Sequence, residues 1–102
     1  MTDQDTPVFD TLAAMTAVSI DNCDLTARDH MMVRIAALVA ADAPAASYLL
    51  NADTAANVGI TLEDVQGILI AIAPIVGAPR VVDAAANITE ALGFEIAMIE
   101  NS

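Results

Sequence analysis

The sequence predicts an all-α fold: one domain of about five helices that assembles with other copies of itself. Apolar residues recur at helical spacing along most of the chain, and glycines separate the segments in which they do so. Hydrophobic residues make up 57% of the 102 positions, and the mean hydropathy is +0.62. A chain of this length has a large surface for its volume. So much apolar content therefore predicts that part of the surface is buried between copies.

The N-terminal quarter predicts a disordered start and then a helix. Residues 1–6 are polar and are expected to be disordered. A first helix is predicted from Pro7 to about Val18, where apolar side chains recur near helical spacing. The connector that follows, 19–24, is rich in turn-forming residues.

A second helix is predicted from Thr26 to Ala41. Thr26 is a suitable N-cap, and Asp29 follows in the first turn, where a negative charge is favoured. Its wide apolar face predicts packing in the core, and the methionines on it are interpreted as gap-filling core residues.

The central stretch, 43–79, predicts two helices joined by a tight turn. Ala45 to Val58 contains no helix breaker and is rich in alanine, so it is expected to form one helix that Gly59 ends. Thr61 and Asp64 have the spacing of a capping box, which predicts that the next helix begins at Leu62.

That next helix is predicted to run to Val76 and to be buried on all sides, because no polar residue follows Ile68 within it. Gly67 is expected to allow another helix to approach closely, and Pro74 is expected to kink the backbone. A last helix is predicted from Val81 to Leu92. The apolar residues beyond Gly93 are expected to form a short segment that docks on the domain or on a neighbour.

The central stretch resembles the carboxymuconolactone decarboxylase family, which includes the alkyl hydroperoxidase D proteins. The resemblance lies in Gly59-Ile-Thr-Leu-Glu-Asp-Val and in the later Ala-Pro-Ile-Val-Gly-Ala-Pro that ends at Pro79. Leu25-Thr-Ala-Arg-Asp and the helix after it also fit the family, so that 25–92 corresponds to its helical core. The resemblance implies that family's helical fold and a homo-oligomer, a trimer or a hexamer.

The positions that carry reactive groups in that family hold unreactive side chains here. The two cysteines and the histidine of its peroxidase members fall at Pro44, Ser47 and Asn51. The glutamate and histidine of its decarboxylase type fall at Ser47 and Asn51, and the usual tyrosine before the second glycine is Ile75. The resemblance therefore carries no catalytic residue over to this chain.

Composition excludes several classes of partner. The net charge is −11, with fourteen acidic residues against three arginines, which argues against binding nucleic acid or an anionic membrane surface. The longest apolar run, 68–76, is too short to span a bilayer. Because the acidic N-terminus resembles no secretory signal, a cytoplasmic protein is expected. The acidity itself fits a soluble oligomer, a high-salt cytoplasm or a cationic partner.

Cys23 is the single cysteine, so no disulfide, redox pair or cysteine zinc site can form within one chain. Neighbouring acids favour an unreactive structural thiol. We expect neither a metal nor a cofactor.

Four residues near the centre are candidate ligand-binding groups: Ser47, Tyr48, Asn51 and Arg80. Ser47, Asn51 and Thr54 fall at i, i+4 and i+7 and form one polar stripe on an otherwise apolar helix. Such a stripe can face a pocket, face solvent or hydrogen-bond between subunits. Arg80 can bind a substrate carboxylate or form a salt bridge.

Ser47 and Asn51 are also the weak candidates for catalysis, together with His30, the only histidine. For His30 a position at the surface or an interface is favoured, because no orienting partner is evident.

Three hypotheses for function follow. The leading one is an oligomeric relative of the family without its redox chemistry, which binds a small organic molecule or has a structural role. The alternative is a decarboxylase or lactone-processing enzyme that uses Ser47 and Asn51. A hydroperoxide reductase acting through Cys23 is the least favoured, because it needs a second thiol.

Overall fold

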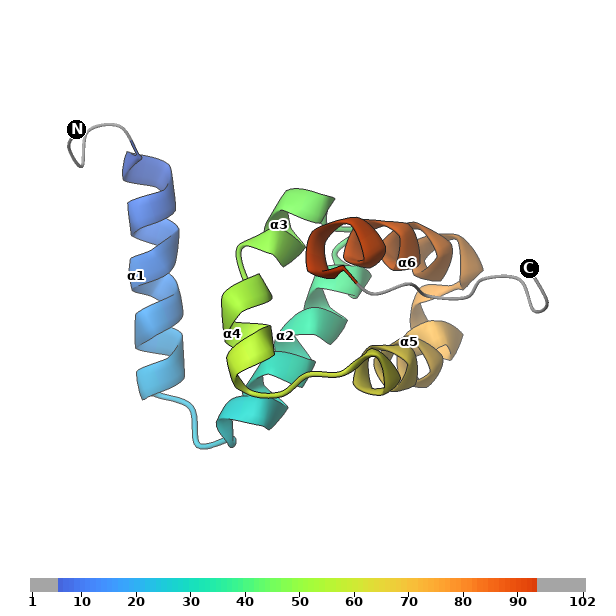
Figure 1. The fold of residues 1–102 in the computed structure, drawn as a ribbon, viewed down its shortest axis with the longest axis horizontal. Helices are drawn as coiled ribbons and strands as arrows, with labels where there is room; N and C mark the ends of the chain where they lie inside the picture. The colour runs from blue at the N-terminus through green and yellow to red at the C-terminus, as the bar shows by residue number, and fades with distance from the viewer. Residues whose placement is uncertain (1–5, 94–102) are drawn as a thin grey trace.

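The computed structural model describes residues 6–93, and over this range the chain is all-helical, with six helices and no strand (Figure 1). The expected docking segment beyond Gly93 lies outside the described residues. Helices α2–α6 pack into one body, while α1 stands to one side of it (Figure 1). The helices are α1 Pro7–Asp21, α2 Ala27–Ala40, α3 Ala45–Leu49, α4 Ala52–Asn57, α5 Leu62–Val76 and α6 Ala78–Leu92.

The core of the body lies where α2 packs against α5 and where α3 packs against α6. Each of these helices contributes apolar side chains that are almost completely buried, as the periodicity of the sequence predicts for helix faces that meet a neighbour. The buried residues are Met31, Ile35, Val39, Ala43, Tyr48, Ala55, Ile60, Val65, Ile68, Leu69, Ala84, Ala85 and Ile88. Burial of this apolar surface is what holds the body together.

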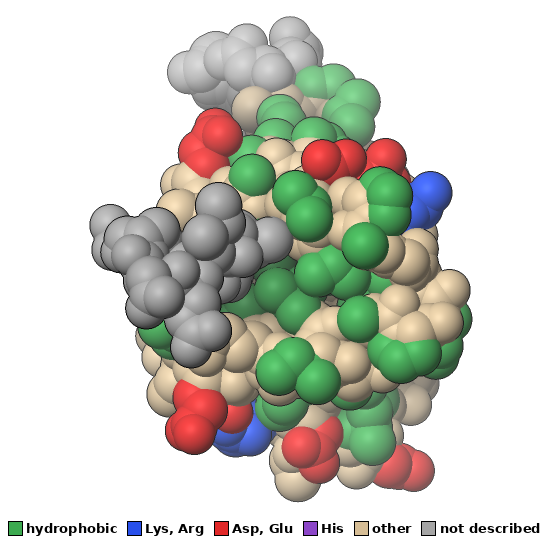
Figure 2. All heavy atoms as spheres, turned by 90° about the vertical axis from the view of Figure 1, so that its right-hand side faces the viewer, with side chains coloured by type: hydrophobic (Ala, Val, Ile, Leu, Met, Phe, Trp, Pro, Cys, Tyr) green, Lys and Arg blue, Asp and Glu red, His purple; other side chains and the backbone are tan. Residues whose placement is uncertain are grey.

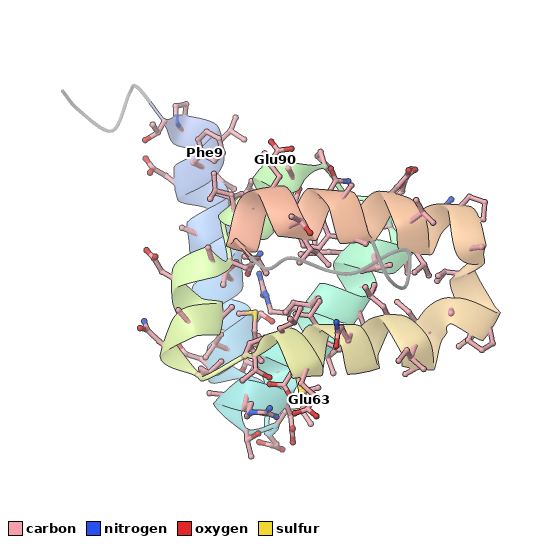
Figure 3. All side chains as sticks on the ribbon, turned by 45° about the vertical axis from the view of Figure 1, so that its right-hand side comes forward. Phe9, Glu63 and Glu90 are labelled. Atoms are coloured by element: carbon pink, nitrogen blue, oxygen red, sulfur yellow. The ribbon has the colours of Figure 1, made fainter. Side chains whose placement is uncertain are left out.

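Both predicted N-caps are present. The Thr26 side chain accepts a hydrogen bond from the Asp29 backbone at 3.1 Å, and Thr61 and Asp64 form a reciprocal capping box. Arg28, at the start of α2, also forms a salt bridge with Asp64 and so joins the first turns of α2 and α5. Glu63, in the first turn of α5, is labelled in Figure 3 and locates this contact in the picture.

The capping contacts hold the pKa of Asp64 below its usual value. The hydrogen bond from the Thr61 backbone N–H contributes most, followed by the hydrogen bond from Arg28. Because the pKa is lower in the folded state, the stabilisation by Asp64 is present above the unfolded-state pKa and is lost as the pH falls through the folded-state pKa.

Removing the Thr61 cap is expected to destabilise the domain. Thr61→Ala should lower the free energy of unfolding by about 1 kcal/mol, because one backbone N–H at the start of α5 loses its partner. Urea denaturation followed by circular dichroism measures the change. Thr11→Ala, at an exposed threonine inside α1, is the control and should have little effect. Equal stability of Thr61→Ala and the wild type would contradict the role given to this cap.

The prediction of one helix from Ala45 to Val58 is wrong, because the helix breaks at Leu50 and Asn51. In a continuous helix the Asn51 backbone N–H would donate to the Ser47 carbonyl. Instead it donates to the Tyr48 carbonyl at 3.0 Å, and the Asn51 side-chain amide donates to the Ser47 carbonyl at 3.0 Å. An asparagine side chain that takes the place of a backbone donor in this way is a recognised competitor of helix continuity.

The prediction that α5 is buried on all sides is also wrong for the single chain. Its bounds are those predicted, and it runs through Pro74 to Val76, but its outer arc is exposed. Ile70 is 74% exposed and Ile75 is 84% exposed, because α2 and α6, the described helices that contact α5 most, lie on its other side. Gly67 does not serve a close approach, since a Cβ there would meet nothing within 4 Å.

The turn between α5 and α6 is made by Gly77 alone. Its φ of 91° lies in the region that favours glycine, and Pro79 then occupies the first turn of α6. Helix α6 consequently starts at Ala78, three residues before the predicted Val81. Among the described residues, none of the helices is both long enough and apolar enough to cross a membrane.

Candidate binding cleft

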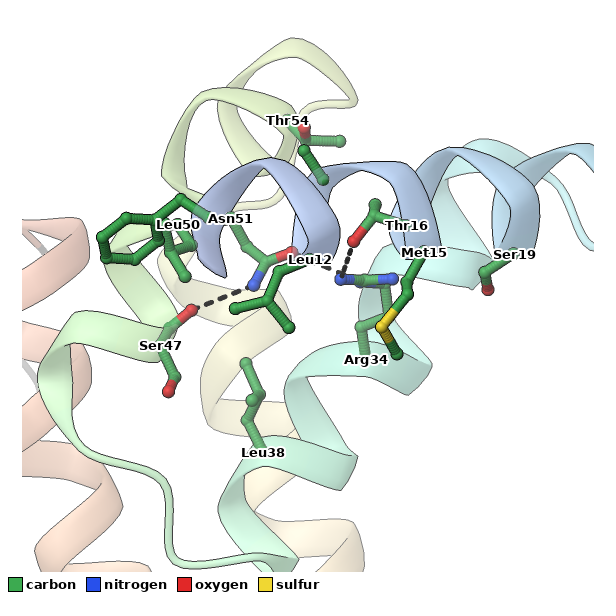
Figure 4. A pocket seen from close by; sticks show the side chains of 12 residues that line it. Leu12, Met15, Thr16, Ser19, Arg34, Leu38, Ser47, Leu50, Asn51 and Thr54 are labelled. Carbon is green, nitrogen blue, oxygen red and sulfur yellow. Dashed lines mark hydrogen bonds between the residues drawn. The ribbon is translucent and has the colours of Figure 1, made fainter. Parts of the chain in front are cut away.

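A cleft of about 590 Å³ lies between α1 and the part of the body formed by α2, α3 and α4 (Figure 4). Its volume is in the range of small-molecule sites, about 300–1,000 Å³. The walls are mostly apolar, with a small number of polar side chains among them. The lining residues are Phe9, Leu12, Ala13, Met15, Thr16, Ser19, Arg34, Leu38, Ser47, Leu50, Asn51 and Thr54.

Helix α1 forms one wall of the cleft with its apolar face. The lining residues of α1 fall on one side of the helix, whereas Asp10 and Asp21 fall on the opposite side. No side chain of α1 is buried: Leu12 is 41% exposed and Met15 is 61% exposed. Phe9 marks the N-terminal end of this wall in Figure 3. Apolar side chains of α1 therefore face an open space.

Arg34 of α2 is the charged group of the cleft, and two hydrogen bonds fix its position. Its Nε donates to Asn51 Oδ1 at 3.2 Å, and one terminal nitrogen donates to Thr16 Oγ1 at 3.4 Å. Asn51 is itself held by the bond from its amide nitrogen to the Ser47 carbonyl, so the three elements α1, α2 and the α3–α4 break meet at this guanidinium (Figure 4).

The other two arginines have different partners. Arg28 pairs with Asp64, and Arg80 donates to the Ala40 carbonyl at 2.7 Å. Within residues 6–93, no carboxylate lies within salt-bridge distance of Arg34. Since a guanidinium has five N–H donors and Arg34 uses two, three remain to meet a ligand or water.

The polar stripe predicted from the sequence faces the cleft. Ser47, Asn51 and Thr54 all line it, although the helix that was expected to carry them is broken between the first and the second. The break turns the Asn51 amide toward Arg34, where its oxygen accepts a hydrogen bond. Asn51 is partly buried rather than open to bulk solvent.

Tyr48, Arg80 and His30 lie away from the cleft. Tyr48 follows Ser47 by one residue, and the 100° step of a helix turns it into the core, where it is 1% exposed. Arg80 donates a hydrogen bond to the Ala40 carbonyl at the C-terminal end of α2 and does not line the cleft. His30 is partly buried in the first turn of α2 and is not among the lining residues.

Burial raises the pKa of the Tyr48 phenol to about 12, and the negative charge of Asp42 adds to the shift. The hydroxyl has no hydrogen-bond partner among the described residues. Ionising this group in the apolar core is costly, because nothing nearby compensates the charge. Tyr48 is therefore a neutral core residue and not a reactive one.

Neither the role of Arg34 nor the α1 wall was predicted from the sequence. The position of Arg34 one helical turn before Leu38 placed both on one face of the predicted second helix. No local pattern could show that α1 and the α3–α4 break both lie next to Arg34 in the folded chain.

As the described residues line it, the cleft offers groups suited to binding. Its polar side chains are hydroxyls, one amide and one guanidinium, and none of these exchanges a proton readily near neutral pH. Cys23, the lone thiol, is partly buried in the connection between α1 and α2 and does not line the cleft. In the described part of the chain, no group of three His, Cys, Asp or Glu side chains is placed to hold a metal ion.

No family model matches this chain, and comparison with curated proteins and with solved structures gave no match either.

Proposed function

We propose that this protein is a binding protein that holds a small organic molecule in the cleft between α1 and α2–α4. The observation that supports this most is the cleft itself, with mostly apolar walls and a few fixed polar groups. Small-molecule sites commonly combine an apolar lining with a small number of well-placed polar groups.

The exposed face of α1 supports the same proposal. Six apolar residues of this helix are more than 40% exposed, among them the cleft-lining Phe9, Leu12 and Met15. Covering apolar surface of this kind stabilises a complex by about 25 cal/mol per Å². A ligand with an apolar body that fills the cleft would cover both walls at once.

We also propose that the protein is a homo-oligomer and a divergent relative of the carboxymuconolactone decarboxylase family that has lost its redox chemistry. The exposed arc of α5 supports the assembly, because it has no charged residue in a strongly acidic chain. It consists of Gly67, Ile70, Ala71, Pro74 and Ile75. Figure 2 shows hydrophobic side chains spread over the end of the molecule that carries the α5–α6 turn, with acidic side chains above and below them.

We do not extend the proposal to catalysis. Ser47 and Asn51, the candidates for a decarboxylase or lactone-processing reaction, lie in the cleft without an acid or base beside them. We assign Ser47 and Asn51 a positioning role instead: Asn51 orients Arg34, and the Ser47 carbonyl orients Asn51.

Binding of a neutral apolar probe tests the proposal. Octanamide should bind the wild type, and the NMR signals of the Leu12, Met15 and Leu50 methyl groups should shift on titration. Leu12→Ser should weaken this binding about tenfold, since it removes one apolar wall contact.

Val18→Ser is the matched control, because Val18 is an exposed apolar residue of α1 that does not line the cleft. Neither change should affect folding much, as both side chains are exposed. No binding to the wild type, or equal weakening by the two variants, would reject the cleft as the binding site.

A further inference from the structure

Resting on the proposed binding function, we infer that the ligand of the cleft is an organic monocarboxylate with an apolar body, and that Arg34 binds its carboxylate. This assigns a ligand class and a recognition residue to the cleft.

Among the described residues, Arg34 is a cation held in place by hydrogen bonds and without a carboxylate partner. Its Nε–H and one terminal N–H are occupied by Asn51 and Thr16, which stops the long side chain from swinging into solvent. The remaining terminal N–H groups have no partner within the described residues. Since burying a charge away from water is costly unless it is paired, a partly buried guanidinium among apolar side chains favours an anionic ligand.

The acidic side chains of the described residues do not pair with Arg34. Within residues 6–93 no carboxylate lines the cleft, and Asp10 and Asp21 fall on the far side of α1. Acidic residues outnumber arginines by fourteen to three, yet among the described residues only Arg28 has a carboxylate partner. Arg80 donates to the Ala40 carbonyl, and Arg34 is the arginine that lines the cleft.

One guanidinium matches one carboxylate in both charge and shape. The planar fork of an arginine presents two parallel N–H groups to the two carboxylate oxygens, and such pairs are among the stronger hydrogen bonds in proteins. A phosphate dianion would carry twice the charge against the same single cation. The cleft walls from Leu12, Leu38 and Leu50 then receive the apolar body.

Comparing the affinities of octanoate and octanamide isolates the contribution of the carboxylate charge, because the two molecules have the same apolar chain and differ only in the head group. Octanoate is expected to bind the wild type about tenfold to a hundredfold more tightly than octanamide by isothermal titration calorimetry, from the charge-assisted contact. The Nε–Hε signal of Arg34 should also shift with octanoate. With three arginines in the chain, that signal can be assigned by mutation.

Arg34→Gln is expected to abolish the preference for octanoate while octanamide still binds. Arg34→Lys, which keeps the charge and loses the fork, should retain part of the preference. Arg80→Gln is the matched control, since Arg80 is exposed and lies away from the cleft. It should leave the ratio of the two affinities unchanged.

The possible failures are distinguishable. Equal wild-type affinities for the two probes would overturn the carboxylate inference and leave the binding proposal intact, whereas absence of binding by both probes would overturn both. A preference for octanoate that persists in Arg34→Gln would show that another group holds the carboxylate. The shift of the Arg34 signal in the wild type decides the matter even if the variants fold poorly.

Discussion

Replacing Ile70 and Ile75 together by serine is expected to convert the proposed homo-oligomer into monomers. The two side chains are the most exposed large apolar groups of the described chain, and they lie on the uncharged outer arc of α5. In an oligomer buried through this arc, each isoleucine would contribute about 1.5–3 kcal/mol by leaving water. Two such losses shift an association constant by several powers of ten.

Light scattering coupled to size-exclusion chromatography measures the mass of the wild type and the double variant at micromolar concentration. Val33→Ser, at an exposed valine of α2, is a change of the same kind elsewhere and should leave the mass unaltered. Circular dichroism should show that the double variant keeps its helices, since neither isoleucine is part of the core. A wild type that runs as a monomer would reject the assembly altogether.

Tyr48 is expected to make the protein lose stability between about pH 10 and pH 12. Its pKa is raised to about 12 in the folded state, whereas an unfolded tyrosine titrates near 10. The stabilisation is therefore complete below the unfolded-state pKa and is lost as the pH rises through the folded-state pKa. At about 1.4 kcal/mol per pKa unit, the loss amounts to roughly 3 kcal/mol.

The composition makes this titration clean, because the chain has one tyrosine and no lysine. Phenolate absorbance follows Tyr48 directly, and urea denaturation at each pH follows the free energy of unfolding. Tyr48→Phe should remove the loss between pH 10 and 12. At neutral pH it should also raise stability by about 1 kcal/mol or more, because it removes a buried hydroxyl that lacks a partner. A phenolate that forms near pH 10 without unfolding would show that Tyr48 is not buried as described.

Local patterns were enough to predict most of the helix boundaries. Capping by Thr26 and by Thr61 with Asp64, and termination at Gly77, each depend on a few neighbouring residues, and α2 and α5 begin where these patterns place them. The break at Asn51 was not predicted, although its cause is also local. Whether an asparagine amide replaces a backbone bond depends on which donor its oxygen meets, and here that donor is Arg34, seventeen residues earlier.

The sequence by itself determined that this chain is helical, acidic and without a cysteine pair, and that Ser47, Asn51 and Thr54 share one face. The tertiary structure alone decided that α1 lies apart from the body and that its apolar face and Arg34 border the same cleft. It also decided that Tyr48 points into the core and that the outer arc of α5 is exposed. These features depend on contacts between segments far apart in the chain, and hydrophobic periodicity gives the faces of a helix without saying which neighbour each face meets.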